Sequence, residues 1–494
     1  MRVPATSSYQ PAPQTPNPAY SQAIQSERDM TAELSSMMSA SWNAGAAAVQ
    51  TQSETSTPGF SPPNFAPPTI QIYAGKLFDP YNAQASPQPA HLRVDDVWTR
   101  HGFFLHPYSE TSWEDQVTRE SLAERTVRAT AHARKTLMAG FTAVRDLGTE
   151  GAEDADMALR KCLSGPNPII PGPRYFVSNR AIVTTGSYGP KNGRYPNRDG
   201  VEGIMGAEVA DGVEECIKAV RRQVGAGADW IKLYADYRAR ANMAAVAPAV
   251  AGESVDTFTD EEITAMVTTA HKLGVKVAAH CSGPRSSSLL RGRVDTVEHA
   301  YEFLADPRVS VEQIFDGSRS STFWVPTLAA HLTIGRNSRS WDQAQRTFRQ
   351  VIKDYPNGDV RIACGGDTGV FAHGDNALEL KTMVRLGAHW SHVLRWATLG
   401  GWECIRSLRW EGHEGRQRLQ KVEQLQEDAR FVGDNEVPFG AIRKGFAADI
   451  IATSGDVASA FEHAVDKGSI VFVMKGGRVF KRNGRESAQD HGAH

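Results

Sequence analysis

The sequence predicts an α/β fold in which parallel strands and helices alternate to form a (β/α)8 TIM-like barrel. Two observations lead to this class. Short apolar runs typical of strands alternate with segments that have the apolar spacing of helices through most of the 494 residues. Four of these runs end at a side chain suited to catalysis or metal binding, which is where such barrels carry their chemistry.

The elements of the barrel follow in chain order. Thr259 is expected to cap a helix over 260–273, and the other expected helices are Leu122–Met138, 213–224 and 368–399. The charged stretch 413–434 is expected to be a solvated helix or an insertion. Strands are also expected at 142–146, 174–178 and 323–328, and the last of the four runs above is expected to form a strand at 361–365.

Domain boundaries follow changes in composition. Pro, Ser, Thr, Gln and Ala dominate residues 1–66, which cannot bury enough apolar surface to offset the entropy lost on ordering. We therefore expect 1–66 to be a disordered low-complexity tail, with a second disordered tail at 485–494. The barrel is assigned to 95–435, and strand patterns flank it on both sides.

Charge and cysteine content exclude several classes of function. The formal net charge is -2 and the pI is about 6.7, so the basic footprint of nucleic-acid binding is missing. The five cysteines are odd in number and lack paired spacing, which indicates a reducing, cytoplasmic compartment. No apolar run approaches the length of a membrane span. We expect a small-molecule substrate, no nucleic-acid or membrane partner, and a surface compatible with a homo-oligomer.

The four side chains that end apolar runs are the main candidates for chemistry. They are Lys232, His280, His299 and Asp367. Imidazole and carboxylate are metal ligands, and a lysine amine becomes one when carbon dioxide converts it to a carbamate. A single histidine at a strand end is more often structural, and a buried lysine is often an ion-pair partner. Four such residues on successive barrel units favour a site.

These residues and several longer motifs resemble the amidohydrolase superfamily. The similarity is greatest to its branch of imidazolonepropionase-like enzymes, Xaa-Pro dipeptidases and fungal ochratoxin-hydrolysing amidases. The supporting motifs are GFTAVRDLG at 140–148, RAIVTTGSYGP at 180–190, KLYADYR at 232–238, FGAIRKGFAADIIATSGD at 439–456 and VFVMKGGRVF at 471–480.

The resemblance implies a second module beside the barrel. Both chain ends are expected to build a small composite β-sandwich, from residues 67–94 and 436–484. The strand beginning at Thr69 would pair with the hairpin that turns at Gly476 and Gly477. The stretch 67–94 is shorter than the sandwich strands of the family require, so this half is expected to be truncated.

The resemblance also implies the chemistry. His280 and His299 would hold a divalent metal, most simply Zn²⁺, and a carbamate on Lys232 would bridge to a second. Such a metal polarises a carbonyl and supplies hydroxide from bound water at neutral pH. Asp367 would be both a ligand and the general base and acid, and Tyr234 would stabilise the oxyanion. The further candidates for substrate contact are His331 and His373.

One departure from the family pattern concerns the first barrel strand. The family has a His-x-His pair there, whereas this chain has Trp98 and Arg100 within 94–110. His101 is the candidate replacement ligand, and His106 lies five residues further on. Two explanations are open: an exon absent from the coding sequence, or a real paralogue with an altered first metal site.

The expected function is therefore metal-dependent hydrolysis of an amide or related C–N bond. Suitable substrates are dipeptide-like compounds, N-acyl amino acids and cyclic amides. One alternative is a pseudoenzyme, a barrel kept for binding after loss of the His-x-His pair. Another is a Schiff-base lyase in which Lys232 is a free nucleophilic amine. Metal content and amide turnover test the first alternative, and borohydride trapping tests the second.

Overall fold

The computed structural model describes most of the chain beyond residue 101. It covers 77–78, 85–86 and 102–487, except for 166–167, 193, 196, 199, 202–203, 205, 239–252, 291–293, 306, 308–309 and 316–320. The described residues belong to one compact unit that begins at Tyr73. His101, Trp98, Arg100 and the two predicted tails lie outside the described residues, except that the tail predicted from 485 is described as far as 487.

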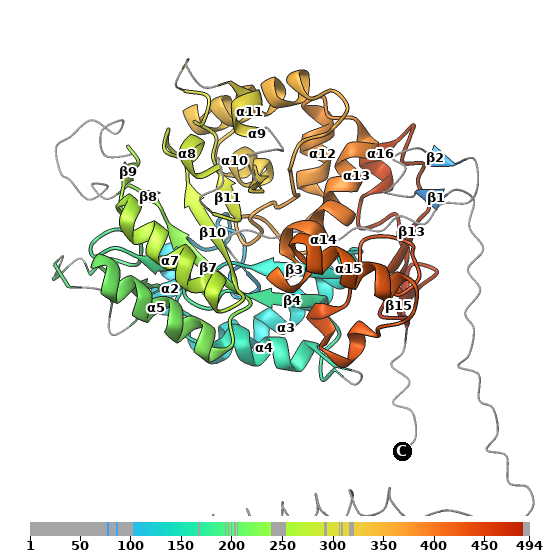
Figure 1. Ribbon diagram of the computed structural model, residues 1–494, viewed down its shortest axis with the longest axis horizontal. Coiled ribbons are helices and arrows are strands. Elements are labelled where there is room, and N and C mark those ends of the chain that lie inside the picture. Colours follow the sequence, from blue (N-terminus) through green and yellow to red (C-terminus); the bar gives the residue numbers. More distant parts are fainter. Residues whose placement is uncertain are drawn as a thin grey trace, which may run out of the picture. The chain divides into compact units, whose positions relative to one another are not determined.

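A parallel sheet forms the centre of this unit (Figure 1). The order of its strands is β12-β11-β10-β7-β5-β6. Their bounds are Phe323–Val325, Thr296–His299, Lys276–Cys281, Trp230–Tyr234, Ile182–Val183 and Glu208–Val209. All residues of β7, β10 and β11 are buried, as expected for parallel strands covered on both faces. The carboxyl ends of these strands therefore meet at one edge of the sheet.

A second parallel pair consists of β3 (Ala143–Asp146) and β4 (Arg174–Val177). Arg145 of β3 reaches the main sheet, where its guanidinium lies 3.0 Å from the Glu298 carboxylate of β11 and 4.3 Å from the Trp230 ring centroid. A parallel bridge joins Trp324 to Ile362, where a strand over 361–365 was predicted. The described strands thus show a mixed α/β fold with parallel sheet, and the described pairings do not close into an eight-stranded ring.

Helices alternate with these strands, as predicted. The helix α3 has the predicted bounds Leu122–Met138. The helix α7 (Asp260–Lys272) begins at a capping box in which Thr259 and Glu262 satisfy each other's backbone N–H groups. It packs against α5 (Gly212–Ala226) beside the sheet (Figure 1). None of the helices in the described part of the chain combines the length and apolarity needed to cross a bilayer.

The remaining elements complete the unit. The remaining helices that begin before residue 340 are α2 (Trp113–Arg119), α4 (Ala155–Leu163), α8 (Ser286–Leu290), α9 (Val311–Phe315), α10 (Leu328–Ile334) and α11 (Arg339–Asp354). Later helices are α12 (Leu378–Arg385), α13 (Trp390–Ala397), α14 (Leu399–Ile405), α15 (Gly412–Glu423) and α16 (Phe461–Ala464). Short 3-10 turns lie at η1 (Leu408–Trp410), η2 (Ala429–Phe431) and η3 (Asp434–Glu436), and β8 (Asp236–Tyr237) pairs with β9 (Val255–Asp256).

The C-terminal strands form an antiparallel sheet in the order β13-β14-β15-β16. Their bounds are Ile450–Thr453, Ile470–Lys475, Arg478–Arg482 and Arg485–Glu486. The predicted Gly476–Gly477 turn joins β14 to β15, and both glycines have positive φ. At the other end, β1 (Leu77–Phe78) pairs with β2 (Ala85–Ser86) rather than with these strands. The described residues therefore contain the C-terminal sheet but not the composite sandwich.

Candidate active site

Two of the predicted histidines lie side by side at the carboxyl ends of adjacent strands. His280 is the penultimate residue of β10 and His299 is the final residue of β11. The centroids of their imidazole rings lie 4.6 Å apart. Both side chains are buried, at 4% and 3% exposure. Parallel pairing of Cys281 with His299 fixes this closeness, because it brings the two strand ends level.

Unusual backbone conformations mark this edge of the sheet. His299, Thr327 and Asp367 have φ of 70°, 52° and 61°, in the left-handed region that side chains other than glycine rarely adopt. The bend at His299 is held from outside, because the Trp324 indole N–H donates to its carbonyl oxygen at 2.9 Å. Strain of this kind clusters at functional sites. Here it turns His299 away from the simple alternation of its strand.

His299 is also fixed through its ring. Its Nδ1 lies 2.7 Å from the hydroxyl oxygen of the buried Thr327. A histidine that binds a metal is usually oriented by a hydrogen bond to its other ring nitrogen. Thr327 is suited to that task, and Nε2 is then the nitrogen that faces a ligand.

Lys232 and Tyr234 line the neighbouring strand β7. They are two residues apart, so they share a face, and both are fully buried. Tyr234 is the register partner of His280, and their rings stack with centroids 4.7 Å apart. The other face of Tyr234 stacks on Tyr188 at 4.3 Å, and the Lys232 Nζ lies 5.6 Å from the Tyr234 centroid. The predicted lysine, tyrosine and histidine therefore form one buried cluster.

Asp367 is buried in the loop after the Ile362 bridge, and it acts electrostatically on Glu379 of α12. Burial raises the pKa of the Glu379 carboxyl to about 8, and the charge of Asp367 adds to the rise. The Glu379 oxygens accept the backbone N–H groups of Leu328 and Ala329 at 3.1 and 2.6 Å. Glu379 thereby anchors the start of α10 immediately after Thr327.

The two remaining predicted histidines differ in position. His331 of α10 lies beside the site, with its ring 5.8 Å from that of His299 and 5.0 Å from that of Tyr301. His373 lies with His132, whose ring stacks on it at 4.1 Å, and its Nε2 bonds the Leu105 carbonyl oxygen at 2.9 Å. Burial lowers the pKa of His373 well below its usual value. These contacts make His373 an anchor for the segment around Leu105.

The replacement ligand predicted near the chain start is only partly described. His101 lies outside the described residues, so its place as a metal ligand stays a prediction. His106 is described, and its ring nitrogens lie 3.2 Å from Glu110 and 3.0 Å from Glu120. In the part of the chain that the structure describes, no three His, Cys, Asp or Glu side chains form a group able to hold a metal ion.

Sequence reasoning missed several polar residues around the site. Asp236 is buried and accepts the backbone N–H groups of Ser282 and Gly283 at 3.0 and 2.7 Å, with its carboxylate 3.8 Å from the His280 Nε2. Asp146 ends β3 and accepts the Tyr175 hydroxyl. Both residues lie within the motifs KLYADYR and GFTAVRDLG, and that position was the available signal. Thr327 lies in none of these motifs, so the sequence did not point to it.

Comparisons with known proteins identify the family of the chain. The model of the Amidohydrolase family matches residues 99–407. The ochratoxinase of Aspergillus niger is 25% identical over 374 residues, which cover 70% of this chain and 67% of the relative.

Solved structures show the same fold. A Xaa-Pro dipeptidase with bound methionine in the active site aligns with a TM-score of 0.61 and 22% identity, over 83% of this chain and 98% of that one. The A. niger ochratoxinase structure aligns with a TM-score of 0.58 and 23% identity, over 80% and 84% of the two chains. Because the family model spans more than half of the sequence, the chain belongs to the amidohydrolase family.

Proposed function

We propose that this protein is a metal-dependent hydrolase of an amide or related C–N bond in a small molecule, built on a closed TIM-like barrel. The observation that carries the proposal is the buried pair of His280 and His299 at adjacent strand ends, oriented by Thr327 and bent by a left-handed backbone. Membership of the amidohydrolase family supports hydrolysis of amide-type bonds. The names of its relatives, ochratoxinase and Xaa-Pro dipeptidase, suggest amides of amino acids.

The donor set fits one divalent cation in kind. Two imidazoles and the Asp367 carboxylate are ligands of the borderline type that Zn²⁺ accepts, with Mn²⁺, Fe²⁺ and Co²⁺ as alternatives. Lys232 would add oxygen donors as a carbamate, and its burial beside Tyr234, the register partner of His280, supports this role. When bound, the metal would polarise the scissile carbonyl and make water nucleophilic at neutral pH.

The chain's own residues would carry the proton and the charge. Asp367 would accept the proton of the attacking water and donate it to the leaving nitrogen. The C–N bond would then break while Asp367 returns to its starting protonation state. The buried Glu379, with its raised pKa, would keep the surroundings of Asp367 from accumulating a second full negative charge. The Tyr234 hydroxyl would donate a hydrogen bond to the developing oxyanion.

The test combines metal analysis with turnover of a defined amide panel. The full chain, purified without added metal, would be analysed by elemental spectrometry and then assayed with Zn²⁺ on Xaa-Pro dipeptides and N-acyl amino acids. We expect His280→Asn to lower metal content, and Asp367→Asn to lower kcat by roughly 100-fold or more. His413→Asn is the matched control, because His413 is exposed on α15.

Three outcomes would overturn the proposal. Metal content that does not differ between His280→Asn and His413→Asn would remove the histidine pair as the metal site. Tight metal binding without turnover of any amide would favour a binding protein instead. A borohydride-trapped adduct with a carbonyl compound at Lys232 would favour the lyase alternative.

A further inference from the structure

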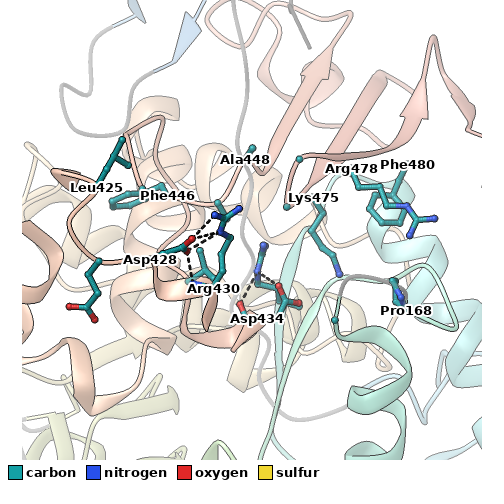
Figure 2. Close-up of a pocket in the computed structure, with 18 residues that line it drawn as sticks. Pro168, Leu425, Asp428, Arg430, Asp434, Phe446, Ala448, Lys475, Arg478 and Phe480 are labelled. Atoms are coloured by element: carbon teal, nitrogen blue, oxygen red, sulfur yellow. Dashed lines mark hydrogen bonds and ion pairs between the residues drawn. The ribbon is translucent and has the colours of Figure 1, made fainter. Parts of the chain in front are cut away.

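A second site lies against the C-terminal sheet. A cavity of about 880 Å³ opens between the segment 425–437 and strands β14 and β15 (Figure 2), a volume in the range of small-molecule sites. Figure 2 shows Asp428 and Arg430 on one side of the cavity and Lys475, Arg478 and Phe480 on the other. Apolar surface comes from Leu425, Val437, Phe446 and Phe480.

Each acidic residue of the cavity wall forms an ion pair with an arginine. Glu427 pairs with Arg409 at 3.0 Å. Asp428 pairs with Arg430, with the guanidinium Nε 2.8 Å from the carboxylate. Asp434 lies 3.3 Å from the Nε of Arg174, which also pairs with Asp449. Arg174 is therefore shared by two carboxylates, and each acidic residue of the wall already has an arginine partner.

Two cations of the wall have no carboxylate partner among the described residues. Lys475 is only 7% exposed, and its ammonium donates to backbone carbonyls alone, to Gly172 at 2.7 Å and Leu163 at 3.5 Å. Arg478 contacts the Phe480 ring at 5.4 Å, and Lys475 lies 6.0 Å from the same ring. The cavity therefore carries two positive charges around one aromatic ring.

Burial of the lysine charge is costly without an anion. Burial lowers the pKa of Lys475 to about 8, the acidic Asp434 and Asp449 oppose the shift, and Arg174 and Arg478 add to it. An anion beside Lys475 would reverse that cost, since an opposite charge favours the protonated amine.

The cavity is separate from the candidate active site. It lies at Arg174, the first residue of β4, and at the turn between β14 and β15. The candidate catalytic residues instead lie toward or beyond the carboxyl ends of their strands. A ligand of the cavity would therefore not be the hydrolysed substrate.

We propose that this cavity binds a small amphiphilic anion, with its carboxylate or phosphate group at Lys475 and Arg478 and its apolar body against Phe446, Phe480 and Leu425. The charged group would meet two cations that lack a carboxylate ion-pair partner among the described residues, and the apolar body would replace water over the aromatic rings.

Isothermal titration calorimetry of the full chain tests this directly. The probes are 4-phenylbutyrate, phenyl phosphate and the neutral benzyl alcohol, and the tighter of the two anions identifies the preferred head group. We expect at least one anion to bind and benzyl alcohol to bind at least about tenfold more weakly, since two charge-assisted hydrogen bonds are lost. Equal affinity for all three probes, or no binding of either anion, would overturn the proposal.

Three substitutions localise the binding. Lys475→Met and Arg478→Met keep apolar stems, and each should weaken the anion about tenfold. Lys481→Met is the matched control, because Lys481 is also a buried lysine of this sheet that donates to backbone carbonyls but does not line the cavity. The affinity of Lys481→Met for the anion should equal that of the wild type.

A thermal melt of each variant shows whether it is folded. If Lys475→Met does not fold, Arg478→Met still tests anion binding independently. Binding that is lost in His280→Asn but kept in both cavity variants would place the anion in the candidate active site and overturn the proposal.

Discussion

At the scale of single residues, the site depends on side chains that hold one another. His299 is constrained at its carbonyl oxygen by Trp324 and at Nδ1 by Thr327. His280 is constrained by stacking on Tyr234 and by the nearby Asp236. Such outer contacts fix the direction of a ligand's lone pair, so they govern metal affinity nearly as much as the ligands do.

Thr327→Val is the sharpest test of this idea. Valine keeps the size and β-branching of threonine, so it places the same demand on the left-handed backbone and removes only the hydroxyl. We expect metal affinity to fall roughly 10- to 100-fold with little change in the thermal midpoint of the metal-free protein. Thr327→Ser should restore most of the affinity. Unchanged affinity in Thr327→Val would show that the hydroxyl does not orient His299.

Lys232 is expected to act as a carbamate, and this can be separated from a packing role. Lys232→Ala should abolish turnover and lower metal content, because the carbamate oxygens are removed. It also creates a cavity in a fully buried place, so loss of activity alone would not decide between the roles. Partial rescue by propionate together with metal would identify a missing carboxylate. Near-normal turnover in Lys232→Ala would make the lysine structural.

At the scale of elements, the sequence predicts the helices and strands whose capping residues or apolar spacing lie within the element itself. The helix α3 was predicted with its observed bounds, and the cap of α7 at Thr259 was confirmed. The strand predicted over 323–328 instead ends at Val325, because Pro326 lacks an N–H for the ladder and Thr327 is left-handed. The charged stretch 413–434 is α-helical only as far as Glu423, and the short 3-10 turn η2 follows within it.

The candidate site was predictable to a similar extent and for the same reason. His280 and His299 end recognisable strands, so their proximity follows from parallel pairing. Thr327 could not be predicted, because its bond to His299 joins residues 28 positions apart and depends on a left-handed conformation without a glycine signal. His373 follows Asp367 in sequence, but its contacts to Leu105 and His132 come from distant elements.

The stacked pair of His132 on α3 and His373 makes the segment at 103–105 sensitive to acid. His132 Nδ1 bonds the Phe103 carbonyl oxygen, and burial lowers its pKa from 6.5 to about 4, with smaller lowering by Lys135, Arg128 and His106. A histidine with a depressed folded-state pKa stabilises the fold above about pH 6.5, and this contribution is lost as the pH falls toward about 4.

We therefore expect the thermal midpoint to fall between pH 6.5 and 4, by an amount equivalent to about 1–3 kcal/mol for His132. His132→Asn keeps a donor for the Phe103 carbonyl but cannot titrate, so its midpoint should depend less on pH in this window. His413→Asn, at an exposed position, should behave as wild type. Parallel pH profiles for all three proteins would contradict the role given to His132.

At the scale of the whole molecule, the candidate active site and the cavity proposed to bind an anion lie at different ends of the strands. The candidate active site has two buried histidines where strands β10 and β11 end. The cavity at Lys475 and Arg478 lies where β4 begins, against the C-terminal sheet. A ligand in that cavity would stabilise the folded unit by mass action without competing with substrate. Anion binding and amide turnover are therefore expected to have independent saturation curves.

The metal stoichiometry of the whole chain follows from its donors. His280, His299, Asp367 and Lys232 would supply the donors for the one proposed cation. The sequence has Trp98 and Arg100 in place of the histidine pair that the resemblance implies for a second. An arginine near the site would also oppose a second cation by charge repulsion. We expect about one metal ion per chain, bound more weakly than in a binuclear relative.

Elemental analysis of protein purified without added metal measures this stoichiometry, and His101→Asn should leave the metal content unchanged. Two tightly held ions in the wild type, with one lost in His101→Asn, would show instead that His101 rebuilds the second site.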